Sequence, residues 1–260
     1  MAKQEGPIFF TGNIGKLNFY KDKDGYQVRD KGGVTAERVS SDPKFARTRE
    51  NMAEYGAAST NGKYIKQLLK KVEHRTKLTD LSTRLQKILM QMAKEDPSHS
   101  RGHRVVEGGN WDRFLDFDLN PHTRLSSILR WPYEISTDTG KLKVSMPQFH
   151  PSHMLRFPDN ATHFRLHLHR LDINLDEEND NDCIMQETPL IPVETSPIDL
   201  LLEVPMGAPA FRYSLCTLGV EFFQVNLGKA FALAKGKSNP CRIIGWIKQN
   251  KEESKVSTTQ

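Results

Sequence analysis

Residues 163–169 read HFRLHLH, a strict alternation of polar and apolar side chains. A period of two is typical of a β-strand that buries one face and leaves the other polar. Further short alternating or apolar runs follow residue 104, separated by turn residues, at 142–146, 198–204, 213–225, 229–234 and 242–247. Six or seven short strands at this spacing predict an antiparallel β-sandwich of immunoglobulin-like size.

Before residue 104 the apolar residues follow the period of a helix instead. Ile65, Leu68, Leu69 and Val72 stand at i, i+3, i+4 and i+7, and the apolar residues of 79–93 keep the same spacing. Both patterns predict amphipathic helices. A further helix is expected to begin at Asp42-Pro43, with Asp as the N-cap and Pro in the first position, and to be interrupted near Gly56 and Asn61-Gly62.

Residues 17–28 alternate on either side of a Lys-Asp-Gly turn and predict a β-hairpin. Two strands alone are marginal in water, so we expect this hairpin to pack on other parts of the protein or on a partner. The prediction is an α+β protein with a basic hairpin-plus-helices module over 1–104, a β-sandwich module over 105–250 and a flexible tail over 251–260. The polar stretch 96–104 marks the boundary.

Composition limits the class of protein. The chain has 260 residues, of which 37% are apolar and 27% charged, and no window approaches the roughly 18 continuous apolar residues of a membrane span. Its start lacks the pattern of a secretory signal, so we expect a cytoplasmic protein with no membrane partner. Three cysteines without a C-x-x-C pair argue against a disulfide framework and against a cysteine-rich zinc site.

Charge is distributed unevenly along the chain. Residues 1–104 hold 21 Lys and Arg against 12 Asp and Glu, whereas residues 105–260 hold 16 against 20. We expect the basic half to contact an acidic protein surface, or alternatively nucleic acid, while an ordinary solvated helix face stays the simpler interpretation. A second alternative is a self-assembling subunit, a homo-oligomer. The expected contact residues are Arg29, Lys44, Arg47, Arg49, Lys63, Lys66, Lys70 and Lys71.

Histidine gives a weak metal candidate. His163, His167 and His169 share one face of the alternating strand, with Arg165 between them, and His150 or His153 could supply a further ligand. Arg165 would repel a cation and no carboxylate has a ligand spacing. We therefore predict a polar, solvated outer face and no metal site.

Two groups of carboxylates have simple interpretations. The run from Asp172 to Asp182 resembles a calcium loop in its spacing, with Asp176, Glu178, Asp180, Asp182 and Glu187 as the candidate ligands. Its sixth position is Asn181 rather than Gly, and strands surround it, so a solvated loop is favoured. The carboxylates Asp112, Asp116 and Asp118 are expected on the solvated face of a strand.

Searches for catalytic motifs are negative. The sequence has no G-x-S-x-G elbow, Walker loop, dinucleotide fingerprint or H-E-x-x-H, and the G-x-x-G at residues 12–15 precedes a hairpin rather than a helix. We therefore predict a non-catalytic binding or assembly protein without a cofactor.

Several segments resemble an uncharacterised family of soluble Bacteroidota proteins. They are GNIG (12–15), the pairs Phe19-Tyr20 and Val28-Arg29, and the blocks 43–51, 158–164 and 218–226. The resemblance implies a bacterial, soluble protein of two modules, and it implies no particular activity, cofactor or site.

Overall fold

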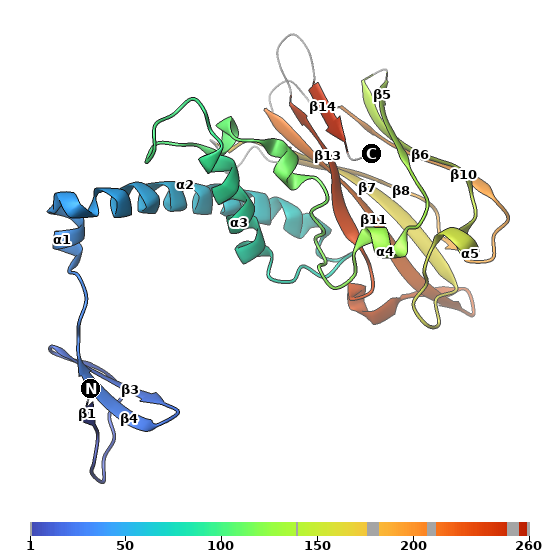
Figure 1. Ribbon diagram of the computed structural model, residues 1–260. Coiled ribbons are helices and arrows are strands. Elements are labelled where there is room, and N and C mark those ends of the chain that lie inside the picture. Colours follow the sequence, from blue (N-terminus) through green and yellow to red (C-terminus); the bar gives the residue numbers. More distant parts are fainter. Residues whose placement is uncertain (1, 139, 176–181, 207–211, 249–254, 259–260) are drawn as a thin grey trace. The chain divides into compact units, whose positions relative to one another are not determined.

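The computed structural model describes residues 2–138, 140–175, 182–206, 212–248 and 255–258 (Figure 1). The chain forms two compact units, Met1–Met52 and Ala53–Gln260. Five α-helices and three antiparallel sheets among the described residues make the fold α+β, as predicted. In this described part, no helix is long and apolar enough to cross a membrane.

The first unit is built on a small four-stranded sheet in the order β1-β4-β3-β2. Its strands are β1 (Ala2–Lys3), β2 (Gly12–Ile14), β3 (Leu17–Asp22) and β4 (Gly25–Asp30). Strands β3 and β4 form the predicted hairpin, and Gly25 has a φ of 110°, a conformation that favours glycine. The hairpin is thus part of a four-stranded sheet, so its two strands do not have to be stable alone.

The predicted helix start at Asp42 is confirmed. Helix α1 (Ala36–Ser41) is capped by Thr35, and Asp42 caps the short 3₁₀ turn η1 (Pro43–Phe45) by accepting from the Lys44 amide at 2.9 Å. Helix α2 (Ala46–Leu69) then continues through both positions where an interruption was expected. Gly62 is useful there because a Cβ would lie only 3.2 Å from Leu89 of α3 (Leu81–Lys94), so the glycine permits close helix packing.

The second unit contains the other two sheets. The large sheet has the order β14-β13-β11-β7-β8, with β12 paired to β11 and β9 to β7, and the small one has the order β10-β6-β5. The strands are β5 (Glu134–Asp138), β6 (Lys141–Phe149), β7 (His163–Ile173), β8 (Asp182–Glu187), β9 (Ile191–Pro192), β10 (Ile198–Pro205), β11 (Tyr213–Asn226), β12 (Lys229–Ala232), β13 (Cys241–Lys248) and β14 (Lys255–Thr258). The remaining helices are η2 (Lys70–Val72), η3 (Val106–Gly108), η4 (Trp111–Phe114), α4 (Leu125–Ile128), α5 (Pro151–Met154) and η5 (Leu233–Gly236).

Two apolar cores cover the two faces of the large sheet. One core joins it to the small sheet, through residues such as Leu166 of β7 and Val144 of β6. The other joins it to the helices, through residues such as Leu171 of β7 and Leu85 of α3. The large sheet is therefore the middle layer between a second sheet and a helical layer.

The boundary expected at residue 104 does not separate two cores, because residues on both sides of it share the helix-side core. The polar stretch before it is a turn inside the second unit. There the Asp96 carboxylate accepts from the amides of Ser98 and Val105, each at 2.9 Å. Residue 104 is followed by short helical turns, and strands begin only at Glu134, so the change of hydrophobic period does not mark the end of a core.

Two other expectations concern the sandwich and the tail. Two sheets do pack face to face, but seven strands lie in one and three in the other, whereas a constant-type immunoglobulin domain divides them four and three. The immunoglobulin-like form stays a prediction. In the expected tail, β14 pairs with β13 over residues 255–258, and the other tail residues lie outside the described part.

All three cysteines are free thiols. Cys216 and Cys241 are buried, and burial raises the pKa of each to about 12. Cys183 is half-buried, and its pKa is also raised by burial.

A pair of glycine substitutions tests the packing of the helical layer. A Cβ on Gly109 would lie 2.2 Å from the Met92 carbonyl oxygen at the end of α3, whereas a Cβ on Gly56 of α2 would have no atom within 4 Å outside its chain neighbours and its own helix backbone. We expect Gly109→Ala to lower the free energy of unfolding by about 2 to 3 kcal/mol through overpacking. Gly56→Ala should raise it by up to about 1 kcal/mol through helix propensity. Urea denaturation measures both, and equal effects would contradict the packing described.

Candidate binding groove beside helix α2

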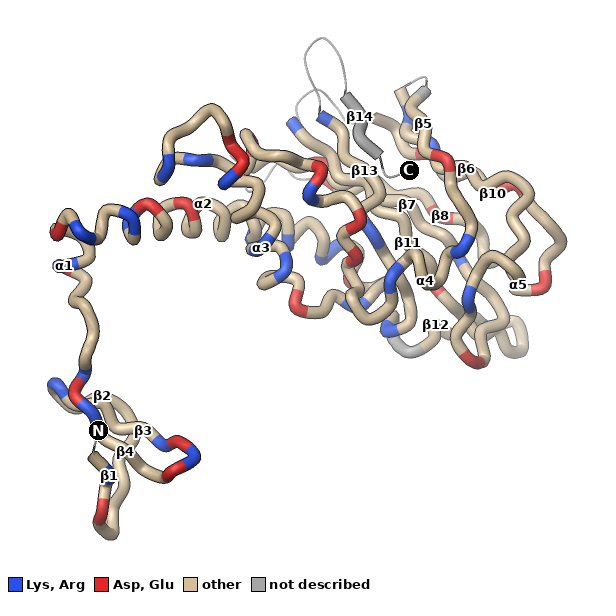
Figure 2. The backbone as a smooth tube through the Cα atoms, viewed as in Figure 1, with Lys and Arg blue, Asp and Glu red and all other residues tan. Residues whose placement is uncertain are grey.

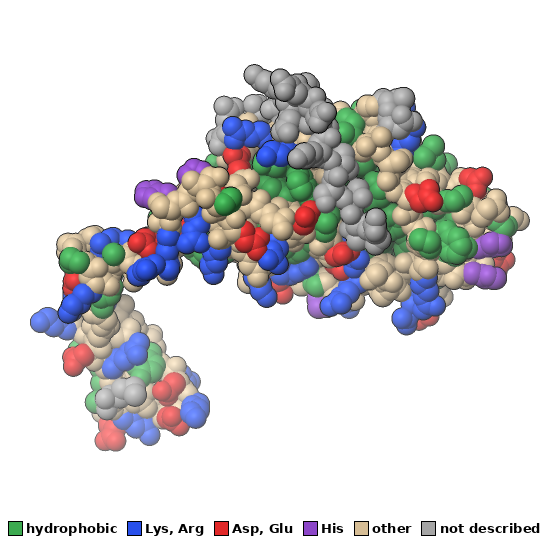
Figure 3. Space-filling model, turned by 45° about the horizontal axis from the view of Figure 1, so that its top comes forward, with side chains coloured by type: hydrophobic (Ala, Val, Ile, Leu, Met, Phe, Trp, Pro, Cys, Tyr) green, Lys and Arg blue, Asp and Glu red, His purple; other side chains and the backbone are tan. Residues whose placement is uncertain are grey.

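The eight basic residues predicted at a contact fall into two groups, one in each unit. Arg29, Lys44, Arg47 and Arg49 belong to the first unit, and Lys63, Lys66, Lys70 and Lys71 to the second. Figure 2 shows basic positions of α2 and α3 interleaved with a few acidic ones. Blue and red side chains are likewise interspersed over the face shown in Figure 3. A specific site must therefore come from local geometry rather than from one continuous basic surface.

The first group is mostly occupied with its own unit. Arg49 Nη1 donates to the carbonyl oxygens of Val39 and Asp42, at 2.8 and 3.0 Å, so it ties α1 to the start of α2. The Arg29 guanidinium lies 5.2 Å from the centre of the Tyr20 ring, within the range of a cation–π contact. Arg49 is thus better explained by local structure than by partner binding.

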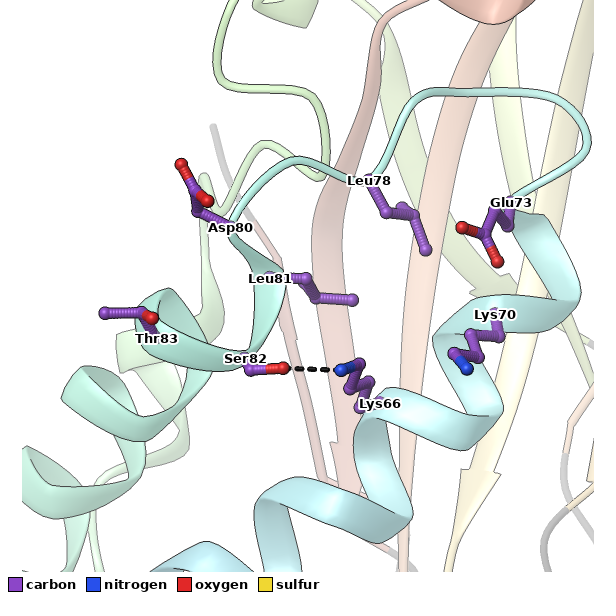
Figure 4. A pocket seen from close by; sticks show the side chains of 8 residues that line it. All are labelled: Lys66, Lys70, Glu73, Leu78, Asp80, Leu81, Ser82 and Thr83. Atoms are coloured by element: carbon purple, nitrogen blue, oxygen red, sulfur yellow. Dashed lines mark hydrogen bonds between the residues drawn. The ribbon is translucent and has the colours of Figure 1, made fainter. Parts of the chain in front are cut away.

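The second group lines a cavity. Lys66 and Lys70 face the first turn of α3 across a space of about 370 Å³ (Figure 4). Lys66 Nζ donates to Ser82 Oγ at 2.6 Å, and Leu81 and Thr83 line the same space. A second cavity of about 210 Å³ adjoins it and shares Lys66 and Ser82 as lining residues. Together the two cavities form what we call the α2–α3 groove.

The sequence pattern explains why lysines line this groove. Helix α2 buries Ile65, Leu68 and Leu69 against the core, and the spacing of three to four residues puts Lys63, Lys66 and Lys70 on a neighbouring side. Lys71 is exposed and lines neither cavity.

Two acidic residues, Glu73 and Asp80, also line the groove, so its three lysines exceed its carboxylates by one charge. Asp80 stands at the N-cap of α3 with a φ of 48°, and its side chain makes no capping hydrogen bond. The positive end of the α3 dipole is thus directed at the groove without a side-chain cap. The arrangement suits one small anionic group held between ammonium groups and helix amides.

Sequence reasoning found the lysines but missed the residues across the groove. Asp80, Ser82 and Thr83 begin the third helical pattern, and Ser and Asp before an apolar repeat are a signal for a helix start. That signal gives the position of a helix N-terminus along the chain, but it does not say what the helix faces.

The histidine face of β7 is buried, and the solvated face predicted for it is wrong. His167 and His169 are 0% and 1% exposed, because the helical layer covers this side of the sheet. His169 Nε2 lies 2.9 Å from His167 Nδ1, so one ring donates to the other. His163 is half-buried and bonds with Thr162 Oγ1 instead. Among the described residues, no group of three His, Cys, Asp or Glu side chains is placed to hold a metal ion.

Arg75 is the cation that covers this face. Its Nη1 donates to Glu221 Oε2 of β11 at 2.6 Å, and its Nη2 lies 2.7 Å from Glu187 Oε2 of β8 without the alignment of a hydrogen bond. Arg165 reaches the other oxygen of Glu187 at 3.0 Å. Burial raises the pKa of Glu221, and Arg75 opposes that effect.

Burial and the charge of Arg75 keep the two histidines neutral. Burial lowers the pKa of His169 to about 3, helped by the charges of Arg75 and His74, and the pKa of His167 also lies well below its usual value. Gly219 of β11 makes room for this pair, since a Cβ there would lie 2.2 Å from the His167 ring. His167 Nε2 is buried and has no hydrogen-bond partner.

Neither of the two clusters of carboxylates is the simple solvated segment that was predicted, as far as the structure describes them. Residues 176–181 of the predicted calcium-like loop lie outside the described part, and Glu187, its last candidate ligand, pairs with Arg75 and Arg165. The strand expected around Asp112 is instead the 3₁₀ turn η4 and a loop, in which Asp116 and Asp118 both pair with Arg242.

Comparisons with protein-family models, with curated proteins and with solved structures find no match for this chain. The family resemblance, the cytoplasmic location and the class of partner therefore stay predictions.

The buried histidine pair predicts that the second unit loses stability in acid. An unfolded histidine titrates near 6.5, whereas folded His169 titrates at about 3, so the unfolded chain takes up the proton first as the pH falls. His169 alone should cost about 2 kcal/mol of unfolding free energy between pH 7 and pH 5. Urea denaturation at the two pH values measures this loss.

His169→Gln should remove about 2 kcal/mol of the loss and leave the share of His167, whose pKa is also lowered, even if it lowers stability overall. His122→Gln, at an exposed histidine, is the matched control and should keep the full loss. A wild-type protein that is equally stable at pH 5 and pH 7 would be incompatible with buried neutral histidines.

Proposed function

We propose that this chain is a non-catalytic binding protein that holds a carboxylate of an acidic partner protein in the α2–α3 groove. The convergence of Lys66 and Lys70 with the first turn of α3 on one cavity supports this most directly. Ammonium groups and helix amides both favour an anion at the same place, so their effects add. In this proposal the two packed sheets are a rigid, immunoglobulin-like platform that supports the helices.

The groove favours an acidic protein over nucleic acid. Of the described residues that line its two cavities, none is aromatic, so the groove offers no surface for base stacking. Glu73 and Asp80 reduce the excess charge of the groove to one positive charge, which a single carboxylate of a protein would neutralise.

Charge reversal tests the groove. The full-length protein should bind poly-L-glutamate at low salt, and Lys66→Glu with Lys70→Glu should weaken binding by at least about tenfold, because two attractions become repulsions. Raising the salt concentration should weaken wild-type binding through screening. Fluorescence anisotropy of labelled poly-L-glutamate measures the dissociation constant.

Lys229→Glu with Lys237→Glu is the matched control, since both lysines are exposed and line neither cavity of the groove. It makes the same change in net charge and should leave binding nearly unchanged. Tighter binding of a single-stranded DNA oligonucleotide than of poly-L-glutamate would favour nucleic acid instead. Equal weakening by both double variants would contradict a localised groove.

The N-terminal sheet supports a second candidate function, self-assembly. The register puts Ile14, Leu17, Phe19 and Val28 on one face, and the opposite face carries polar residues such as Asn18. Phe9 stacks on Tyr26 and Phe10 contacts Phe19, but no side chain described in the first unit is buried. A sheet of this size needs an apolar layer against it to be stable.

A second copy of the chain is the partner that we propose for this face. Lys21 and Asp30 share the apolar face but lie at opposite ends of the β3–β4 hairpin. Two copies related by a two-fold axis would therefore bring the lysine of each near the aspartate of the other. The apolar residues between these charges would be covered in the same contact.

Sedimentation of the full chain at micromolar concentration should show a dimer. Ile14 and Leu17 are directly paired and 57% and 40% exposed, so Ile14→Asp with Leu17→Asp should give a monomer without disturbing a core. Asn13→Asp with Gln27→Glu adds the same charge to the opposite face and should leave the dimer intact. A strictly monomeric wild-type protein would end this candidate.

A further inference from the structure

A cavity of about 330 Å³ lies beside α4, separate from the α2–α3 groove. Leu125, Leu129 and Tyr133 give it apolar walls, and Asp116, Ser126 and Arg242 are its polar lining residues. Its volume is in the range of small-molecule sites, which combine an apolar interior with a few polar groups. Nothing in the proposed function uses this cavity.

Arg242 in this cavity is already neutralised and cannot be the centre of an anion site. Its Nε and Nη2 donate to the two oxygens of Asp118, each at 2.9 Å, and Nη1 donates to Asp116 Oδ1 at 2.8 Å. Nη2 also reaches Ser126 Oγ at 3.2 Å. Asp118 thus lies near two guanidiniums, those of Arg242 and Arg84, whereas the described ion pair of Asp116 is with Arg242 through one oxygen.

Asp116 gives the cavity a half-exposed carboxylate. Among the described residues, its only hydrogen bond through the side chain is the one from Arg242 to Oδ1, and the side chain is 53% exposed. Asp116 also has a φ of 62°, a left-handed conformation that costs energy in residues other than glycine and is often found at functional sites. Its second oxygen is therefore available to a cationic ligand.

The Tyr133 side chain provides an apolar and a polar group at the same place. Burial raises the pKa of its phenol, so the hydroxyl stays protonated at neutral pH. The ring can pack against an aliphatic chain or a cation. Asp116, Ser126 and Tyr133 all line the cavity, and each side chain has an oxygen that can accept from one of the three donors of an ammonium group.

We infer that this cavity binds an alkylammonium group, as found in a small primary amine or a lysine side chain, with the charge on Asp116 and the chain against Leu125, Leu129 and Tyr133. A guanidinium fits less well, because Asp116 Oδ1 is occupied and a two-point contact needs both oxygens.

Ligand-observed NMR with the full-length protein tests this inference. n-Pentylamine, charged at neutral pH, should bind in about the millimolar range expected for so few atoms, whereas pentanoate, with the same chain and the opposite charge, should not bind. Asp116→Asn should weaken amine binding by at least about tenfold. Asparagine tolerates a left-handed backbone and keeps the acceptor for Arg242, so the fold should be retained.

Asp159→Asn, at an exposed carboxylate that lines a different cavity, is the matched control and should leave amine binding unchanged. Nα-acetyl-lysine methylamide distinguishes the two sources of the ligand. If it binds more tightly than pentylamine, the ligand is a lysine side chain of a partner protein. If it binds more weakly, the ligand is a free amine. Binding of pentanoate as tight as that of pentylamine, or no effect of Asp116→Asn, would overturn the inference. The Lys66 and Lys70 variants should not affect amine binding. This experiment can therefore fail without contradicting the proposed function, and the proposed function can fail without contradicting this inference.

Discussion

One face of the large sheet in the second unit is polar and yet buried, and this burial depends mainly on Arg75. Buried charges are costly unless they are paired, and Arg75 lies between Glu187 and Glu221 while Arg165 reaches the first of them. Its backbone is also held, because Asn239 Nδ2 donates to the Arg75 carbonyl oxygen at 2.7 Å. Removing this one cation would leave Glu221 without its hydrogen-bond donor and Glu187 with Arg165 alone under the helical layer.

The same contact positions the groove. Arg75 lies three residues after the end of η2, so the end of α2 is fixed over β8 and β11 when Arg75 reaches their glutamates. The chain must then turn back before α3 begins at Leu81, and that reversal brings the first turn of α3 to Lys66 and Lys70. The groove is thus a consequence of how the helices cover the sheet.

Local patterns in the sequence predicted local structure well. The alternation at 163–169, the hairpin at 17–28 and the helix start at Asp42 all correspond to elements of the structure. The same alternation could not show what covers the histidine face, because a period of two separates two faces without saying which layer packs on each. Glu73, Asp80 and Ser82 join the lysines only through a chain reversal, and the left-handed backbone of Asp116 leaves no trace in composition. Those features depend on tertiary packing.

The buried cysteines have a practical consequence for chemical labelling. Only the thiolate reacts with maleimides and iodoacetamides, and a thiol with a pKa of about 12 is almost fully protonated at neutral pH. Cys216 and Cys241 are also inaccessible, and the half-buried Cys183 has a raised pKa as well. Toward such reagents Cys216 and Cys241 are therefore unreactive in the folded chain, and Cys183 reacts more slowly than an exposed cysteine. A single cysteine introduced at an exposed position could carry a fluorophore or spin label without replacement of the native thiols.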